Sequence, residues 1–257
     1  MNHPYTPPTP TGDSETSAQA TPHGGTGSPG SSIARLSEPN TLSARALEAR
    51  QLIHRADSVR EQADAFRALR TRLLALGGDT NFVTLVVPIS HGCGGSFVAR
   101  NLAAAFAFDE AKTALLLDCD AWHPSQHTAM GVDANRGGLM DYLSDQAMDP
   151  SQVMYATGVP RLRLIPSGRI SETTNEAYSS FRMRTLMDSL RSRYPDRYLF
   201  LDGPPALGAP DAHILADLAD WVVLVAGYGK VTPKQLEMAT SSFPPEKLAG
   251  VIFNQLP

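Results

Sequence analysis

One stretch, residues 82–101, constrains the fold of this chain more than any other. Its sequence is FVTLVVPISHGCGGSFVARN. Residues 83–87 form an uninterrupted apolar and β-branched run, which predicts a buried β-strand. A turn rich in glycine follows, and Ser96 then opens a helix. In this order of elements, backbone N–H groups and the helix dipole converge on one point. The stretch therefore predicts a site for phosphate groups.

The residue before Ser96 departs from the usual phosphate-loop pattern. That pattern has Lys before Ser or Thr, so that the ammonium reaches the terminal phosphates while the hydroxyl holds Mg²⁺. Gly95 takes the place of the lysine here. Because a charged hydrogen bond contributes roughly 1.5–3 kcal/mol, we expect nucleotide affinity to be about ten- to a hundredfold weaker. We expect phosphoryl transfer to suffer more, because each lost stabiliser of transition-state charge lowers the rate by about 10² to 10³.

Two cations elsewhere in the chain are candidates to replace the lysine. Arg100 lies one turn into the helix, on the side of Ser96. Lys230 follows an expected strand that ends near Ala226, at the edge of the sheet where the glycine turn is expected. Each can reach the predicted pocket, although long cationic side chains usually turn to solvent.

The first part of the chain differs in composition from the rest. Residues 1–40 are rich in Pro, Thr, Ser and Gly, so we expect a disordered tail. Residues 41–257 have the length of one domain. The formal net charge of -4 excludes the basic excess typical of nucleic-acid binding. Apolar runs are too short to span a bilayer and no apolar leader opens the chain, so we expect a cytoplasmic protein with reduced cysteines.

Short apolar runs alternate with helical patterns along residues 82–254. This alternation predicts an α/β domain with a mostly parallel sheet and helices on both faces. The strands expected after the first are 113–117, 162–165, 198–201, 222–226 and 251–253. The expected helices are 96–108, 176–193, 211–218 and 233–240, preceded by two helices within 42–76 that are separated near Asp57 or Ser58.

Acidic side chains follow two of the expected strands. Asp118 and Asp120 come after 113–117, and Asp202 comes after 198–201. Because the carboxyl ends of parallel strands meet at one edge of a sheet, these carboxylates are expected beside the glycine turn. Together with the Ser96 hydroxyl they predict an oxygen-rich Mg²⁺ site that faces a bound phosphate chain. For any one of these residues, a role as a helix cap or turn residue stays open.

Several segments in this order resemble one known family: VVPISHGCGGSFVARNLAAAFA, LLLDCDAWHPSQH, YLFLDGPPALGAPDAHILADLADWVVLVAGYGK and GVIFN. They are similar to the bacterial tyrosine kinases of capsule and exopolysaccharide synthesis, which are phosphate-loop (P-loop) proteins of the same class as the partitioning and cell-division-site ATPases. The similarity runs over residues 63–254. It implies a P-loop NTPase fold, a kinase-like domain over 41–257, and ATP or ADP with Mg²⁺ as cofactor.

The resemblance also implies roles for single residues. The nucleotide-contact residues would be His91, Gly92, Cys93, Gly94, Gly95, Ser96, Phe97 and, at the adenine base, Asn254. Ser96, Asp120 and Asp202 would hold the metal, with Asp202 as the Walker B carboxylate. Asp118 would be the catalytic carboxylate that, with Asp120, helps to activate an incoming tyrosine hydroxyl.

A helix expected before the first strand carries a charged row of Asp64, Arg67 and Arg70. The spacing alone fits a solvated helix face with local ion pairs, each worth only a few tenths of a kcal/mol. The resemblance implies a further role, because relatives use a Glu, Arg, Arg motif at this place to pack subunits into a ring. Asp64 stands here in place of the glutamate. We therefore expect these residues to form a homo- or hetero-oligomer contact.

Two further departures from the family pattern accompany the lost lysine. Trp122 and His123 stand where a pair of basic residues usually follows the acidic motif. The chain also ends at Pro257 without a cluster of tyrosines to phosphorylate. We therefore expect a catalytically impaired, kinase-like component of exopolysaccharide or capsule biosynthesis and export. It would act by contact with a membrane polysaccharide co-polymerase or a paralogous kinase, at the cytoplasmic face of the membrane.

Two alternatives stay open. The chain is an active protein-tyrosine kinase or ATPase if a non-standard cation serves the loop. It is a metal- or redox-responsive regulator if Cys93 and Cys119, with His91 and His123 nearby, share one pocket. The spacings match no standard zinc pattern, and two small buried thiols are the simpler interpretation.

Overall fold

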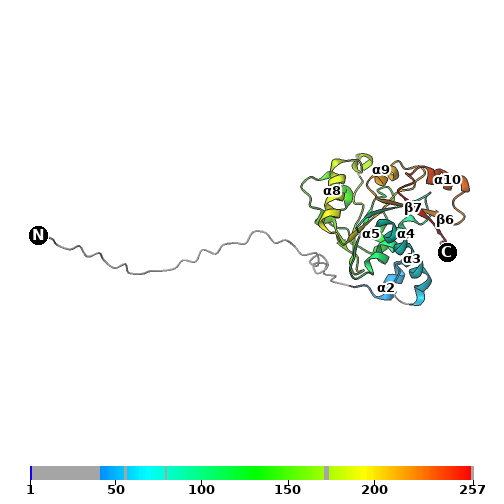
Figure 1. The fold of residues 1–257 in the computed structure, drawn as a ribbon, viewed down its shortest axis with the longest axis horizontal. Coiled ribbons are helices and arrows are strands. Elements are labelled where there is room, and N and C mark those ends of the chain that lie inside the picture. Colours follow the sequence, from blue (N-terminus) through cyan, green and yellow to red (C-terminus); the bar gives the residue numbers. More distant parts are fainter. Residues whose placement is uncertain (2–40, 55–56, 79, 171–173, 256–257) are drawn as a thin grey trace.

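The computed structural model describes Met1 and residues 41–54, 57–78, 80–170 and 174–255. The predicted disordered tail, apart from Met1, lies outside the described residues, and its boundary near residue 40 stays a prediction. Within the described part, no helix is both long and apolar enough to cross a membrane. The described chain folds around one sheet, which lies between two groups of helices (Figure 1).

The sheet has seven strands in the order β3-β4-β2-β5-β1-β6-β7. Neighbouring strands are parallel, except for β3 and β4, which are antiparallel. This confirms the predicted α/β class with a mostly parallel sheet. The strands are β1 (Val83–Pro88), β2 (Thr113–Asp118), β3 (Tyr155–Ala156), β4 (Leu162–Ile165), β5 (Arg197–Asp202), β6 (Trp221–Gly227) and β7 (Leu248–Asn254).

Helices cover both faces of this sheet, as the alternating pattern predicts. The helices are α2 (Ala44–Ala49), α3 (Arg60–Gly77), α4 (Gly95–Ala107), α5 (Gln126–Met130), α6 (Leu139–Ser144), α7 (Thr174–Ala177), α8 (Phe181–Arg193), α9 (Asp211–Asp217) and α10 (Pro233–Ser241), with 3-10 turns η1 (Asp57–Val59) and η2 (Pro150–Val153). Figure 1 shows α8, α9 and α10 on one side of the sheet and α2, α3 and α4 on the other.

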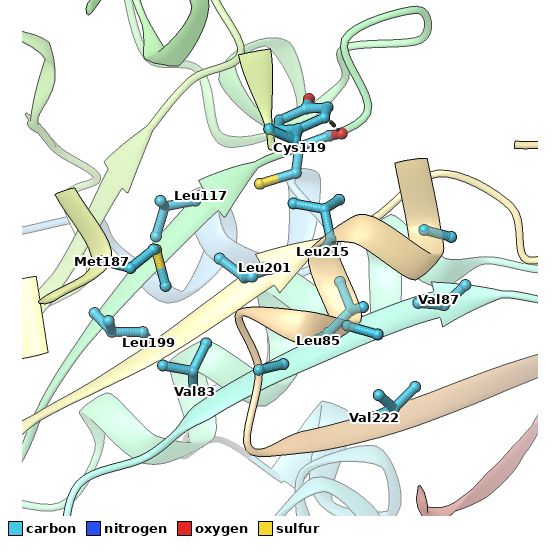
Figure 2. Close-up of a cluster of buried hydrophobic side chains, with 14 of the residues drawn as sticks. Val83, Leu85, Val87, Leu117, Cys119, Met187, Leu199, Leu201, Leu215 and Val222 are labelled. Atoms are coloured by element: carbon cyan, nitrogen blue, oxygen red, sulfur yellow. Dashed lines mark hydrogen bonds between the residues drawn. The ribbon is translucent and has the colours of Figure 1, made fainter. Parts of the chain in front are cut away.

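Each face of the sheet has its own hydrophobic cluster. Successive residues of a strand point to opposite faces, and therefore alternate residues enter the two clusters. On the α8 and α9 side, Met187 and Leu215 pack with Leu117 (Figure 2). On the α3 and α4 side, Phe66 and Phe106 belong to the other cluster. Strands covered on both faces in this way are buried throughout, which is why most of them are visible in the sequence as largely apolar runs, although Arg163 lies within β4.

The prediction of a single helix over 176–193 is wrong, because the chain forms α7 and α8 with a break between them. Ser180 caps α8 by accepting a hydrogen bond from the backbone N–H of Met183. Tyr178, in the break, is buried and donates its hydroxyl to the Cys119 carbonyl oxygen at 2.6 Å. The elements β3, α5 and α6 are not predicted, since lengths of 2, 5 and 6 residues carry too little periodicity.

The carboxyl ends of the parallel strands position the candidate site. β1 ends at Pro88, β2 at Asp118, β5 at Asp202 and β7 at Asn254. In a parallel sheet these ends share one edge, where ligands of such sheets bind. The loops after these strands therefore meet around the turn from β1 into α4.

Candidate functional site

The phosphate loop, residues 89–95, leads from β1 into α4. Gly92 and Gly94 have φ angles of 76° and 85°, a backbone conformation that other residues rarely adopt. Gly94 is the N-cap of α4, which begins at Gly95, one residue before the predicted start, and no side chain caps this end. The first N–H groups of a helix have no acceptor within it, and a left-handed residue before them turns consecutive N–H groups into one concavity. The loop therefore has the geometry predicted for an anion cradle.

Two side chains from the C-terminal part of the chain hold carbonyl groups of this loop. Asn254 Nδ2 donates to the Cys93 carbonyl oxygen at 3.1 Å, and Lys230 Nζ donates to the Gly92 carbonyl oxygen at 2.9 Å. The end of β6 also packs against the loop, because a Cβ on Gly227 would lie 3.0 Å from Cys93 Cα. The loop is fixed from the side of β6 and β7, and Lys230 does contact it.

Gly95 has no room for a side chain. A Cβ built on it would lie 2.6 Å from Cδ, 2.9 Å from Cγ and 3.0 Å from Cβ of Pro88. Protein interiors are close-packed, so a lysine at position 95 would require the Pro88 ring to move. Pro88 therefore fills the space that the first carbon of a lysine side chain at position 95 would occupy.

Asp118 and Asp202 end neighbouring strands and are partners in the parallel register of β2 and β5. Both are fully buried. Asp118 Oδ2 accepts hydrogen bonds from the backbone N–H groups of Ser125 at 3.0 Å and Gln126 at 2.9 Å. Asp202 Oδ2 accepts one from the Gln126 side-chain amide at 2.6 Å. The structure therefore brings together these two predicted carboxylates, and α5 links them.

Gln126 is a site residue that the sequence prediction misses. Its side chain is fully buried, and its Nε2 also donates to the Ser96 carbonyl oxygen at 2.9 Å. One amide thus joins the first turn of α4 to the carboxylate that ends β5. No motif identifies a lone glutamine, and the only signal in the sequence is its place in the short segment after the acidic motif.

The environment of the two carboxylates favours their protonated forms. Burial raises the pKa of Asp118 to about 6, against backbone hydrogen bonds from Gln126 and Ser125 that lower it. Burial, and then repulsion from Asp118, raises the pKa of Asp202 to about 8, while hydrogen bonds from the Gln126 and Ser96 side chains oppose that shift. The Ser96 side chain therefore acts on Asp202, and its role as a metal ligand stays a prediction.

The donor set fits Mg²⁺. Within the described part of the chain, Asp118 Oδ1 and Asp202 Oδ1 are buried without a hydrogen-bond partner, and unpartnered carboxylate oxygens suit a hard cation. Among the described residues, no three His, Cys, Asp or Glu side chains gather as a group that could hold a metal ion. Mg²⁺ does not need such a group, because it is usually bound by one or two carboxylates together with waters and substrate phosphates.

Asp120 is hydrogen-bonded to the segment that follows it, and its role as a metal ligand stays a prediction. Its Oδ1 accepts the backbone N–H of His123 at 3.1 Å and lies 3.5 Å from His123 Nδ1. The His123 ring stands edge-to-face with the His91 ring, with centroids 4.5 Å apart. Asp120 therefore contacts one member of the His91–His123 ring pair at the phosphate loop. Asp118, predicted as the catalytic carboxylate, is the residue in register with Asp202.

A cavity of about 220 Å³ opens beside the loop. Its lining combines apolar side chains with amides and one carboxylate: Leu52, Val59, Phe97, Gln51, Gln62, Asn254, Gln255 and Glu48. Asn101 shapes this cavity, because its side chain accepts the backbone N–H of Ile53 at 2.8 Å and donates to the Gln51 carbonyl oxygen at 2.9 Å. Apolar walls with a few amides are typical of sites for planar heterocycles, and the predicted contacts Phe97 and Asn254 both lie here.

The second candidate cation, Arg100, turns to this cavity wall instead of the phosphate loop. Its Nη2 donates to Gln51 Oε1 at 3.3 Å, and its guanidinium lies over the Phe97 ring, 5.2 Å from the centroid. Burial lowers the pKa of this guanidinium, and the charge of Asp202 opposes that shift. Arg100 therefore contributes to the field near Asp202 without contacting the loop.

The three residues of α3 that are predicted to form an oligomer contact lie in two different environments. Asp64 and Arg67 form an ion pair, and both side chains are exposed. Arg70 Nη1 donates to the Ala105 carbonyl oxygen of α4 at 2.9 Å and so ties the two helices together. Of the three, Asp64 and Arg67 are the residues on the free surface.

Cys93 and Cys119 are both free and buried, but their thiols have different surroundings. Cys93 Sγ lies 3.3 Å from Ser90 Oγ within the loop. Cys119 belongs to the hydrophobic cluster with Leu117 and Met187 (Figure 2). Burial raises the pKa of the Cys119 thiol well above its usual value, so it is protonated and a poor nucleophile.

Known proteins are similar to this chain in both sequence and fold. The chain is 32% identical over 196 residues to the tyrosine-protein kinase Wzc of Salmonella typhimurium, which covers 75% of this chain and 27% of the relative. It is 31% identical over 195 residues to the tyrosine-protein kinase YwqD of Bacillus subtilis, which covers 75% of this chain and 80% of YwqD. The solved BceF tyrosine kinase domain matches with a TM-score of 0.67 at 26% identity, over 85% of this chain and 92% of that one.

A more distant match concerns the fold alone. A plasmid partition protein of Borrelia burgdorferi has a TM-score of 0.51 at 18% identity, over 67% of this chain and 78% of that one. A scan against protein-family models finds no match. The chain spans about a quarter of the length of Wzc (27%), but most of the length of YwqD (80%). On this similarity, the chain belongs to the bacterial tyrosine-protein kinase family.

Proposed function

We propose that the chain is a nucleotide-binding, kinase-like component of exopolysaccharide or capsule biosynthesis in which phosphoryl transfer is impaired. The observation that carries the proposal is a contrast within one site. Asp118 and Asp202 retain free oxygens for Mg²⁺, whereas Pro88 closes the space that a lysine at Gly95 would need. On this proposal the elements for binding are kept, whereas the loop lysine, a main stabiliser of the transition state, is absent.

ATP or ADP would bind with its phosphates on the N–H groups of the loop and its base in the cavity beside Phe97 and Asn254. Asp118, in place of the predicted Asp120, would hold Mg²⁺ with Ser96 and Asp202, and the metal would supply charge neutralisation at the phosphate oxygens. Backbone donors, metal and base contacts together support binding at reduced affinity. The expected reduction is about ten- to a hundredfold relative to a loop with its lysine.

The chain would act by protein contact, with a membrane polysaccharide co-polymerase or a paralogous kinase as its partner at the cytoplasmic face of the membrane. The exposed pair Asp64 and Arg67 on α3 supports this proposal. The strand β7 at the edge of the sheet supports it too, because Phe253 on this strand is 72% exposed. An edge strand presents unpaired backbone groups, which favour association with another chain.

Charge reversal tests the contact. Arg67→Glu places like charges beside Asp64 and should weaken self-association or partner binding, measured by sedimentation at several concentrations. Arg184→Glu is the matched control, because Arg184 is equally an exposed helical arginine but lies on α8, on the opposite face of the sheet. Assembly that is unchanged in Arg67→Glu would contradict the proposed contact.

A second candidate function is an active protein-tyrosine kinase, and the contact of Lys230 with the Gly92 carbonyl oxygen favours it. Transfer of labelled phosphate from ATP to protein tyrosine, with wild type and Asp202→Asn side by side, separates the two candidates. Equal background in both proteins agrees with impaired transfer. Strong labelling in wild type that disappears in Asp202→Asn would establish the active kinase.

A further inference from the structure

We propose that Lys230 is the phosphate-binding cation of this site and acts from the loop between β6 and α10. This inference rests on the proposed function, because it requires that a nucleotide binds. It goes further by naming the residue that supplies the positive charge which the phosphate loop itself lacks.

Lys230 lies directly on the phosphate loop. Its Nζ is 2.9 Å from the Gly92 carbonyl oxygen and 3.2 Å from the point where a Cβ on Gly92 would stand. A tight turn delivers it there: the backbone N–H of Lys230 donates to the Gly227 carbonyl oxygen at 3.1 Å, and Gly229 within the turn has a φ of 69°. The ammonium therefore occupies space left free by a glycine, one short turn from the end of β6.

The Lys230 side chain is exposed to solvent. In the part of the chain that the structure describes, no ion pair involves this residue. An ammonium has three N–H groups, and the Gly92 carbonyl oxygen takes one of them. A neutral amide is sufficient to brace a loop carbonyl, as Asn254 does at Cys93. The exposed charge beside Gly92 is therefore available to an anionic ligand that reaches the loop.

Two other positions are unsuitable for the phosphate-binding cation, position 95 because it lacks space and Arg100 because it has other contacts. A lysine at position 95 would meet the Pro88 ring at 2.6 Å from its Cβ. Arg100 donates to Gln51 and its guanidinium lies over the Phe97 ring. Of these three positions, Lys230 is the one that places a cation in contact with the loop.

On nucleotide binding, Lys230 would exchange the Gly92 carbonyl oxygen for a phosphate oxygen. A phosphate oxygen is a stronger acceptor for an ammonium than a backbone carbonyl, because both partners are charged. A lysine carries its charge on a flexible four-carbon stem, so it can leave the Gly92 carbonyl oxygen for a phosphate oxygen without backbone rearrangement. The ligand class is therefore a nucleoside di- or triphosphate whose terminal phosphates lie over Gly92.

The test is equilibrium binding of Mg²⁺-ADP and Mg²⁺-ATP to the full chain, measured by titration calorimetry. Lys230→Gln keeps a donor without the charge, and Lys230→Arg keeps the charge. Lys234→Gln is the matched control, because Lys234 is an exposed lysine in the first turn of α10. We expect Lys230→Gln to weaken both nucleotides about ten- to a hundredfold, Lys230→Arg to retain most of the affinity, and Lys234→Gln to match wild type.

The other outcomes are equally informative. If wild type binds and Lys230→Gln binds as tightly, the inference is overturned while the proposed function stands. If Lys230→Gln and Lys230→Arg lose affinity equally, Lys230 is a brace that needs its own shape, which also overturns the inference. If wild type binds neither nucleotide, the proposed function falls and the inference falls with it.

Discussion

Asp118 and Asp202 are register partners at the ends of β2 and β5, and both side chains are fully buried. Burial raises the pKa of both carboxyl groups, and repulsion from Asp118 raises that of Asp202 further. Two carboxylates held together away from water are unfavourable unless a proton or a cation is shared between them. The free energy of unfolding should therefore depend on the protonation of these two carboxyl groups.

Asp202→Asn should stabilise the metal-free protein at pH 8. The pKa of Asp202 rises from 3.8 to about 8 on folding, so the folded chain binds more protons than the unfolded chain between these values. Wild-type stability therefore falls as pH rises through that window, and asparagine removes this loss. We expect a gain on the order of 1–3 kcal/mol at pH 8 and a smaller gain at pH 5, measured by urea unfolding with a chelator.

The exposed residue Asp188 provides the control for this comparison, because Asp188→Asn removes a carboxylate from the surface of α8. Its effect should be small and nearly independent of pH. An Asp202→Asn protein that is less stable than wild type at pH 8 would show that the buried charge is compensated in solution.

Gly95→Ala should destabilise the protein by about 1–3 kcal/mol, because the added methyl group overlaps the Pro88 ring. Pro88→Gly opens that space, so the double variant should lose less stability than the sum of the two single variants. Chemical unfolding of the four proteins gives the coupling energy, which should exceed about 0.5 kcal/mol. Strict additivity would mean that Pro88 moves aside freely. By the same reasoning, Gly95→Lys should raise nucleotide affinity only together with Pro88→Gly.

Gln126→Ala should lower stability by roughly 1–3 kcal/mol in the presence of a chelator, because Asp202 and the Ser96 carbonyl each lose a buried donor. Mg²⁺ should restore part of the loss by providing a new partner for the carboxylates. Gln146→Ala, at an exposed position, is the control and should unfold like wild type. A neutral effect of Gln126→Ala would contradict its linking role.

Arg70→Ala and Arg67→Ala should have different effects, although both residues belong to one predicted motif. Arg70→Ala removes the hydrogen bond to the Ala105 carbonyl oxygen and should lower stability by about 1 kcal/mol or more. Arg67→Ala removes an exposed ion pair and should change stability by less than about 1 kcal/mol. Thermal unfolding at one concentration makes the comparison, and equal losses would show that the two arginines share one role.

Much of the fold was predictable because the buried strands are largely apolar runs. The expected strand 162–165 coincides with β4, and the other expected strands fall within observed ones. The helix break at Tyr178 was not predictable, since it depends on the hydroxyl reaching the Cys119 carbonyl oxygen across the fold. Local periodicity carries no information about such a contact.

The candidate site was predictable only in part, for a related reason. Asp118 and Asp202 follow strong strands, so parallel topology alone brings them to one edge. The obstruction of Gly95 by Pro88 depends on the path of the loop between them, which no spacing rule encodes. The place of Gln126 likewise depends on how the segment after β2 folds back over two carboxylates.

The fate of a single bound ATP tests the central claim most directly. The chain would be mixed in excess with trace Mg²⁺-ATP labelled on the γ-phosphate, and the complex recovered and analysed after a time in which an active kinase completes many turnovers. We predict intact ATP bound to wild type, with little labelled phosphate released or transferred. Labelled phosphotyrosine with bound ADP would contradict impaired transfer, and failure to retain any ATP would contradict nucleotide binding.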